Sequence, residues 1–146
     1  MALKKRGKHF YGDSQVDIRD ELRRYGTLAG YPPVQFADAV CTCGSRHFRL
    51  SVDDEEGVAV RVCSACGHEH PMGDSEEYLD EASPGECECP CGTNVFELTV
   101  GVALYDSSDD VRWLYVGCRC KACGLTACYG DWKNEFNGYA ELLRRV

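Results

Sequence analysis

The chain carries the same pattern of cysteine pairs twice. In the first half the pair Cys41 and Cys43 is followed by the pair Cys63 and Cys66; in the second half Cys89 and Cys91 are followed by Cys120 and Cys123. Each pair can supply two metal ligands from one tight turn, and two pairs complete a tetrahedral site of four thiolates. A glycine follows each pair directly, which allows the turn a positive φ. The spacing therefore predicts two Zn²⁺ ions per chain, each bound by one set of four cysteines.

Disulfide bonds are the alternative use of so many cysteines. The chain has 11 of them, an odd number that would leave one thiol unpaired. Its basic N-terminus continues into Phe10, Tyr11 and Gly12 rather than an apolar signal segment, and no stretch approaches the roughly 20 apolar residues of a membrane span. We therefore expect a cytoplasmic protein with no membrane segment, in a compartment that disfavours disulfides. Zinc is then the staple that supports a small core.

The segments between the cysteine pairs read as β-hairpins. Phe48, Leu50 and Val52 alternate with polar residues, as in a half-buried strand, and an acidic turn leads into a second alternating run. The second half repeats these apolar residues at a constant offset of 48, while its last cysteine pair lies at an offset of 57. An internal duplication with a longer second hairpin explains both offsets.

These motifs resemble the zinc-ribbon superfamily, in which two cysteine knuckles at the ends of β-strands bind one zinc ion. The resemblance covers residues 40–67 and 88–124. It departs from the family pattern because the first knuckle of each unit is Cys-x-Cys rather than Cys-x-x-Cys, a shortening that we expect to weaken the N–H···S hydrogen bonds. The expected fold is a small β-rich, metal-stabilised protein: two tandem zinc ribbons with an N-terminal and a C-terminal helix.

Five segments follow from this reading. They are an N-terminal helical arm and connector (1–39), the first ribbon (40–70), an acidic linker (71–87), the second ribbon (88–128) and a C-terminal tail with a helix (129–146). Residues 71–88 contain seven Asp or Glu and no Lys or Arg. This segment, which can open a short helix at Ser75, is either a solvated connector or an acidic docking surface.

Both terminal helices have recognisable boundaries. For the first, Ser14 and Asp17 form a capping-box-like pair and Gly26 suits the end. Its apolar stripe consists of Ile18, Leu22 and Tyr25. The stripe either packs on the zinc units or binds a partner. For the second helix, Asn137 is the expected cap. Its apolar face consists of Tyr139, Leu142 and Leu143.

Several other residues have alternative interpretations. Cys87 and Cys118 lie two residues before expected ligands, but their counterparts in the first unit, Ala39 and Arg61, cannot bind zinc. A substituted ligand set or a Cys87–Cys118 disulfide stays open, and Cys128 is expected to be a buried apolar residue. His68 and His70 follow a cysteine pair closely and are either surface residues, replacement ligands or ligands of a second metal ion. Trp132, between Asp131 and Lys133, either covers the second hairpin or anchors an interface.

The charge distribution bears on the class of partner. The formal net charge is −8; residues 1–24 contain seven Lys or Arg and four acids, so the rest of the chain is strongly acidic. Each Zn(Cys)₄ centre adds a charge of about −2. Such a surface repels a phosphate backbone and suits a basic protein.

We therefore expect a non-enzymatic, zinc-binding protein-interaction module, of an adaptor, inhibitor or immunity type, that binds a basic partner protein. The alternative is a nucleic-acid-associated zinc ribbon that contacts DNA or RNA through its basic arm. The arm's contact residues would be Lys4, Lys5, Arg6, Lys8, Arg19, Arg23 and Arg24. A weaker alternative is a metal-dependent enzyme or an enzyme accessory domain. Sites closed by four cysteines leave no coordination position for a catalytic water, so no catalytic residue is assigned.

Overall fold

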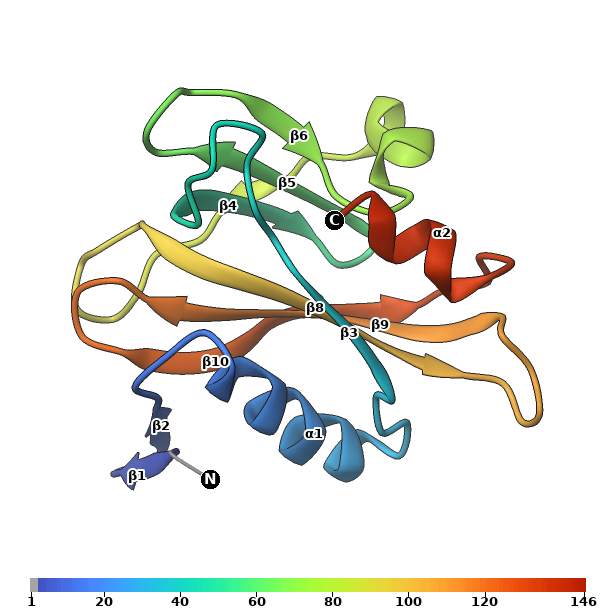
Figure 1. The fold of residues 1–146 in the computed structure, drawn as a ribbon, viewed down its shortest axis with the longest axis horizontal. Helices are drawn as coiled ribbons and strands as arrows, with labels where there is room; N and C mark the ends of the chain where they lie inside the picture. The colour runs from blue at the N-terminus through green and yellow to red at the C-terminus, as the bar shows by residue number, and fades with distance from the viewer. Residues whose placement is uncertain (1–2) are drawn as a thin grey trace.

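The computed structural model describes residues 3–146 and consists mainly of antiparallel β-structure (Figure 1). The strands are β1 Lys4–Arg6, β2 His9–Tyr11, β3 Gln35–Asp38, β4 Phe48–Asp53, β5 Val58–Cys63, β6 Glu69–Pro71, β7 Gly85–Glu86, β8 Phe96–Leu104, β9 Val111–Cys120 and β10 Leu125–Lys133. The helices are α1 Asp17–Ala29, the 3₁₀ helix η1 Ser75–Glu81 and α2 Tyr139–Arg144. Within residues 3–146, no helix has the length and apolar character needed to cross a membrane.

The two expected hairpins are joined in one sheet. Its order is β1-β2-β10-β9-β8-β4-β5-β6, with β3 beside β8 and β7 beside β4. The hairpins meet where Phe48 of β4 pairs with Phe96 of β8. These two phenylalanines are equivalent under the offset of 48. On either side of this pair the strands follow in equivalent order, β8-β9-β10 in one direction and β4-β5-β6 in the other. The duplicated halves are thus related by a local two-fold axis, and their cores are continuous.

The duplication includes more strands than the hairpins. The hairpin registers match through six residue pairs, from Phe48↔Cys63 and Phe96↔Cys120 to Asp53↔Val58 and Gly101↔Tyr115. Under the same offsets, β7 corresponds to part of β3, and β6 corresponds to the first part of β10. Each repeat is therefore a four-stranded unit, which extends beyond the ribbon boundaries expected from the cysteines.

Alternation along the hairpins separates the core from the solvent. Phe48 and Leu50 are buried in the first hairpin while Arg49 between them is exposed. In the second hairpin nearly every residue of β8 is buried, because β3 and α1 lie against it. The longer second hairpin is thus the centre of the molecule.

Helix α1 packs its apolar stripe on the second hairpin (Figure 1). Ile18 and Leu22 are fully buried, which favours packing over partner binding for this stripe. The expected cap Ser14 is wrong: the N-cap of α1 is Val16, which makes no side-chain capping bond. The carboxylate of Asp17 accepts hydrogen bonds from the backbone N–H groups of Asp13 and Ser14, which is one half of the expected capping box.

The expected end of α1 at Gly26 is wrong. Gly26 lies inside the helix, where an added Cβ would come within 2.4 Å of Pro33. The helix ends at Ala29, and its C-cap Gly30 has a φ of 91°. A glycine required for close packing was therefore misread as a terminator.

Two expectations for the tail also differ from the structure. Strand β10 continues to Lys133, across the expected boundary at residue 128, with a bulge between Cys128 and Gly130. A Cβ at Gly130 would lie 2.7 Å from Val52 of the first repeat, so the glycine permits close packing between repeats. Helix α2 begins after Gly138, not after the expected cap Asn137, and has no side-chain cap.

The packing of α1 on Gly117 gives a testable prediction. A Cβ at Gly117 would come within 2.5 Å of Ile18 and 2.9 Å of Leu22, whereas its equivalent in the first repeat is Val60. We expect Gly117→Val to lower the free energy of unfolding by about 1–3 kcal/mol through overpacking, as measured by urea denaturation. Gly85→Ala, where nothing lies within 4 Å of the added Cβ, is the matched control. Equal effects of the two changes would contradict this packing.

Candidate metal centres

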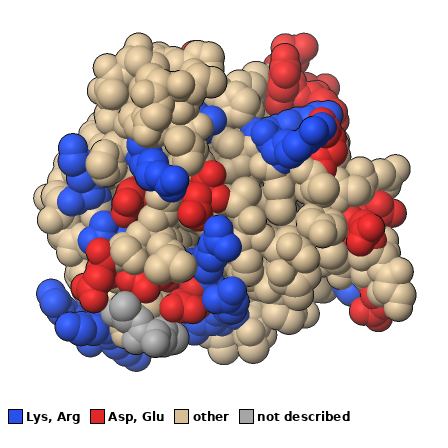
Figure 2. All heavy atoms as spheres, in the orientation of Figure 1, with Lys and Arg blue, Asp and Glu red and all other residues tan. Residues whose placement is uncertain are grey.

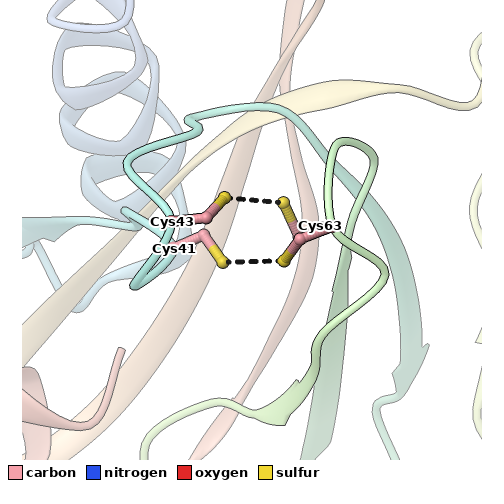
Figure 3. Close-up of side chains that lie close together, drawn as sticks. Cys41, Cys43 and Cys63 are labelled. Atoms are coloured by element: carbon pink, nitrogen blue, oxygen red, sulfur yellow. Dashed lines mark hydrogen bonds between the residues drawn. The ribbon is translucent and has the colours of Figure 1, made fainter.

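The structure brings together the first set of expected ligands. Cys41 and Cys43 lie in the loop before β4, while Cys63 ends β5 and Cys66 lies in the following turn. The Sγ atoms of Cys43 and Cys63 are 3.6 Å apart, and those of Cys41 and Cys66 are 3.5 Å apart. Figure 3 shows Cys41 and Cys43 facing Cys63 across the gap between the two loops. The four sulfurs lie within 4.8 Å of one another.

The second set forms an equivalent cluster. The Sγ atoms of Cys91 and Cys120 are 3.6 Å apart, as are those of Cys89 and Cys123. In each cluster every knuckle provides one buried and one exposed thiol. The two centres therefore share spacing, burial and position relative to their hairpins.

This geometry fits a tetrahedral zinc ion. Zn–S bonds of about 2.3 Å place neighbouring sulfurs of a tetrahedron roughly 3.8 Å apart. The observed separations of 3.5 and 3.6 Å are close to that value and far above the roughly 2.05 Å of a disulfide. All 11 cysteines, each within residues 3–146, are free thiols. The two Cys₄ groups are thus consistent with two zinc ions per chain, which would have a structural role.

The backbone of each knuckle is shaped for this purpose. The four glycines that follow the cysteine pairs all have positive φ, between 77° and 94°. They are Gly44, Gly67, Gly92 and Gly124. Their N–H groups donate to the carbonyl of the first cysteine in the pair, at 2.8–3.0 Å. The predicted conformation of these glycines is confirmed; the closing hydrogen bond spans three residues at the two Cys-x-Cys knuckles and four residues at the two Cys-x-x-Cys knuckles.

Backbone donors also act on the sulfurs. The N–H groups of Cys66 and, less strongly, Ala65 lower the pKa of Cys63 to about 6. The hydroxyl and then the backbone N–H of Thr93 lower the pKa of Cys91 to about 6. The N–H of Cys43 lowers the pKa of Cys41, so the short Cys-x-Cys knuckle keeps an N–H···S bond that we expected to be weakened. Such donors favour the thiolate form that binds metal.

The other candidate ligands lie outside both clusters. Burial raises the pKa of Cys118 well above its usual value and that of Cys87 to about 11, so both are neutral thiols at pH 7. Cys128 is half-buried, and its Sγ lies 3.3 Å from the Gly130 carbonyl. The ring of His70 hydrogen-bonds the backbone carbonyl of Arg145, and His68 lies beside that ring. Among the described residues, neither histidine belongs to a group that can hold a metal.

Trp132 belongs mainly to the core, since it is only 7% exposed and packs against Gly57 of the first hairpin. Its neighbour Asp131 accepts hydrogen bonds from Tyr25 and Trp113, which connect β10 to α1 and β9. The prediction that Trp132 is a core residue is confirmed, but the contact with Gly57 places it against the first hairpin as well as on the sheet of the second hairpin that it was expected to cover. The same tryptophan also lines a surface cleft between the repeats.

The two centres differ in one charged neighbour that sequence reasoning dismissed. Arg61 was excluded as a ligand, yet its buried guanidinium lies close to Cys41 and Cys63, and thiolate charge there opposes the lowering of its pKa by burial. Its equivalent in the second repeat is the neutral Cys118. A buried positive charge offsets part of the charge of about −2 on a Zn(Cys)₄ centre. In the sequence, the only sign of this difference is that Arg61 and Cys118 occupy equivalent positions of the two repeats.

Comparison of the chain with protein-family models, curated proteins and solved structures found no significant match. The zinc-ribbon-like character therefore rests on the two Cys₄ clusters and their hairpins.

The clusters predict metal content. Native mass spectrometry of protein purified without chelator should show two zinc ions per chain. Cys63→Ser should lose one ion and loosen the first repeat, because structural zinc contributes about 10–16 kcal/mol of apparent binding energy. Cys87→Ala and Cys128→Ala should keep two ions and serve as controls. Loss of an ion from either control would show that the ligand set is wrong.

The neighbour of the first centre predicts unequal zinc retention. Replacing Arg61 with Met should speed release of one of the two zinc ions to a chromogenic chelator several-fold, because the positive charge near the thiolates is lost. Arg49→Met, on the exposed face of the same hairpin, should leave both rates unchanged. Equal acceleration of both ions by Arg61→Met would point to general destabilisation instead.

Proposed function

We propose that this protein is a zinc-stabilised, non-enzymatic interaction module that binds a basic partner protein, in the manner of an inhibitor, adaptor or immunity protein. The observation that carries the proposal is that acidic segments separate in sequence form one face. Closed Cys₄ centres support a structural rather than a catalytic use of the metal, since four protein ligands leave no open position.

The acidic turn of the first hairpin and the acidic linker are held together. Asp53 begins a run of four acidic residues in the turn, and its carboxylate accepts a hydrogen bond from the backbone N–H of Ser83 at 2.9 Å. Between these points, η1 exposes Glu76, Asp80 and Glu81 to solvent. The first hairpin and η1 also contact each other. The linker, interpreted as either connector or docking surface, thus lies against the rest of the acidic face.

The positive charges of α1 are largely neutralised by acidic side chains of the same molecule. On α1, three arginines form ion pairs within the molecule: Arg19 with Asp38, Arg23 with Asp20 and Arg24 with Glu21. Figure 2 shows basic and acidic side chains mixed on the face that carries α1 and the N-terminal hairpin. Such mixing weakens a positive field over this face and disfavours a phosphate backbone as the main ligand.

One observation supports nucleic acid as a second candidate. The basic segment at the start of the expected N-terminal helical arm forms strands β1 and β2, and β2 pairs with β10. Lys4, Lys5 and Arg6 are exposed on the outermost strand, with Lys8 in the adjoining turn. An ordered basic edge could contact phosphates, whereas the acidic face would repel them.

A double charge reversal separates the two candidates. Glu76→Lys with Asp80→Lys should slow association with a basic partner about tenfold at low salt, because electrostatic steering is lost. The partner is first identified by co-purification and mass spectrometry, and association is then measured by surface plasmon resonance at several salt concentrations. If nucleic acid is the ligand, the same variant should bind more tightly. Asp106→Lys with Asp109→Lys, exposed at the far hairpin turn, is the matched control.

A further inference from the structure

The acidic face contains a cleft with a distinct composition. It is about 470 Å³ in volume, within the range of about 300–1,000 Å³ typical of small-ligand sites. It lies between the turn of the first hairpin, η1 and the end of β10. Its walls carry five carboxylates against one lysine, from Asp54, Glu55, Glu56, Asp74 and Glu135. The lysine, Lys133, already pairs with Glu135 at 3.2 Å.

Asp74 shows that this is more than an exposed group of acids. The residue is 5% exposed, and its Oδ2 accepts a hydrogen bond from Asn134 at 3.0 Å. Its Oδ1 is buried and has no hydrogen-bond partner among the described residues. Burial raises the pKa of this carboxyl group. The nearby Arg145 pairs with Glu77 and Glu141 instead. A buried carboxylate oxygen without a donor is unfavourable unless a ligand supplies one.

The cleft suits an organic cation better than a metal ion. Among residues 3–146, the groups of three or more side chains close enough to hold a metal are the two cysteine clusters. The cleft carboxylates are thus too dispersed to converge on one ion. The aromatic side chains of Trp132 and Tyr78 complete the walls, and Tyr78 is 47% exposed. Separated acceptors beside aromatic surfaces match the planar guanidinium, which donates in several directions and stacks on rings.

We propose that this cleft binds an arginine side chain of the basic partner. The inference rests on the proposed function, since it names the group by which that partner is anchored. The guanidinium enters between the acidic turn and η1 and contacts the aromatic wall. A rotation of the Asp74 side chain then brings its buried Oδ1 to the cleft, where the guanidinium supplies the donor that this oxygen lacks. The exposed acids around the cleft attract the partner, and the cleft selects the side chain.

A short peptide tests the cleft directly. The probe is an acetylated and amidated Gly-Arg-Gly peptide, compared with the citrulline peptide of the same shape without charge and with the lysine peptide. The chain has two tryptophans. The indole N–H of Trp113 is held by Asp131 and serves as an internal reference in ¹H–¹⁵N spectra. The arginine peptide should shift the Trp132 indole signal saturably and the Trp113 signal little. The citrulline peptide should not shift it, and the lysine peptide should bind several-fold more weakly.

Variants separate the cleft from general acidity. Asp74→Asn should weaken the arginine peptide at least fivefold without lowering the thermal midpoint, because the buried charge is removed. Glu55→Gln with Glu56→Gln, both exposed, should also weaken binding without affecting the fold. Asp106→Asn, outside the cleft, should bind like the unmodified protein.

Several outcomes would overturn the inference. They are equal binding of the citrulline or lysine peptide, displacement of the arginine peptide by Ca²⁺ at equal concentration, equal weakening by Asp106→Asn, or a lower thermal midpoint for Asp74→Asn. Failure of the proposed function looks different. If the arginine peptide binds as described but the partner is not a basic protein, the proposed arginine site is supported and the proposed function is wrong. If charge reversal on η1 slows a basic partner while cleft variants do not, the function stands and the arginine site falls.

Discussion

Four cysteine sulfurs within 3.6 Å of their neighbours form a stable arrangement at neutral pH when a cation balances them. The backbone N–H of Cys66 lowers the pKa of Cys63 to about 6, and the Thr93 hydroxyl lowers that of Cys91 to about 6, while the pKa values of Cys66 and Cys89 in the same clusters are raised. Without a cation, only some of the four sulfurs in a cluster therefore carry a negative charge. When all four sulfurs are thiolates they repel one another, and a bound zinc ion would replace this repulsion with strong local attraction. It also fixes both ends of each hairpin. The metal centres therefore help to set the register in which β4 pairs with β5 and β8 with β9. Because that register decides which side chains face the core, the core depends on the two centres.

Duplication explains how two such small units become one core. The repeats meet at Phe48 and Phe96, equivalent residues that pair across the local two-fold axis. Equivalent positions have then diverged where the repeats face different neighbours. Gly117 makes room for α1 where the first repeat has Val60, and Gly130 admits Val52 at the junction. Arg61 and Cys118 give the two metal centres different electrostatic surroundings. The duplication thus accounts for the strands that the two repeats share, and local packing accounts for the residues in which they differ.

The cysteine spacing and the alternating residues were sufficient to predict the hairpins, the positive-φ glycines and the two sets of four thiols. Sequence reasoning failed where a residue had a long-range role. Gly26 was expected to end the first helix, but it is small because Pro33 packs against it. Strands β3, β7 and β6 are too short to show a period, and in the structure each pairs with a strand of one of the hairpins. Arg61 and Asp74 are charged residues in ordinary local patterns, and only the folded structure shows that both are buried.

Metal content and surface charge are linked in this molecule. Two Zn(Cys)₄ centres would add about −4 to a chain whose formal charge is already −8. Self-repulsion of this size opposes compaction, and a fold that depended on apolar burial alone would tolerate it poorly. Zinc binding would contribute stability that offsets this repulsion and the cost of the buried carboxylate at Asp74, one oxygen of which has no hydrogen-bond partner among the described residues. The free energy of zinc binding would thus offset the repulsion among the surface carboxylates. A positively charged partner bound to this surface would reduce the same repulsion.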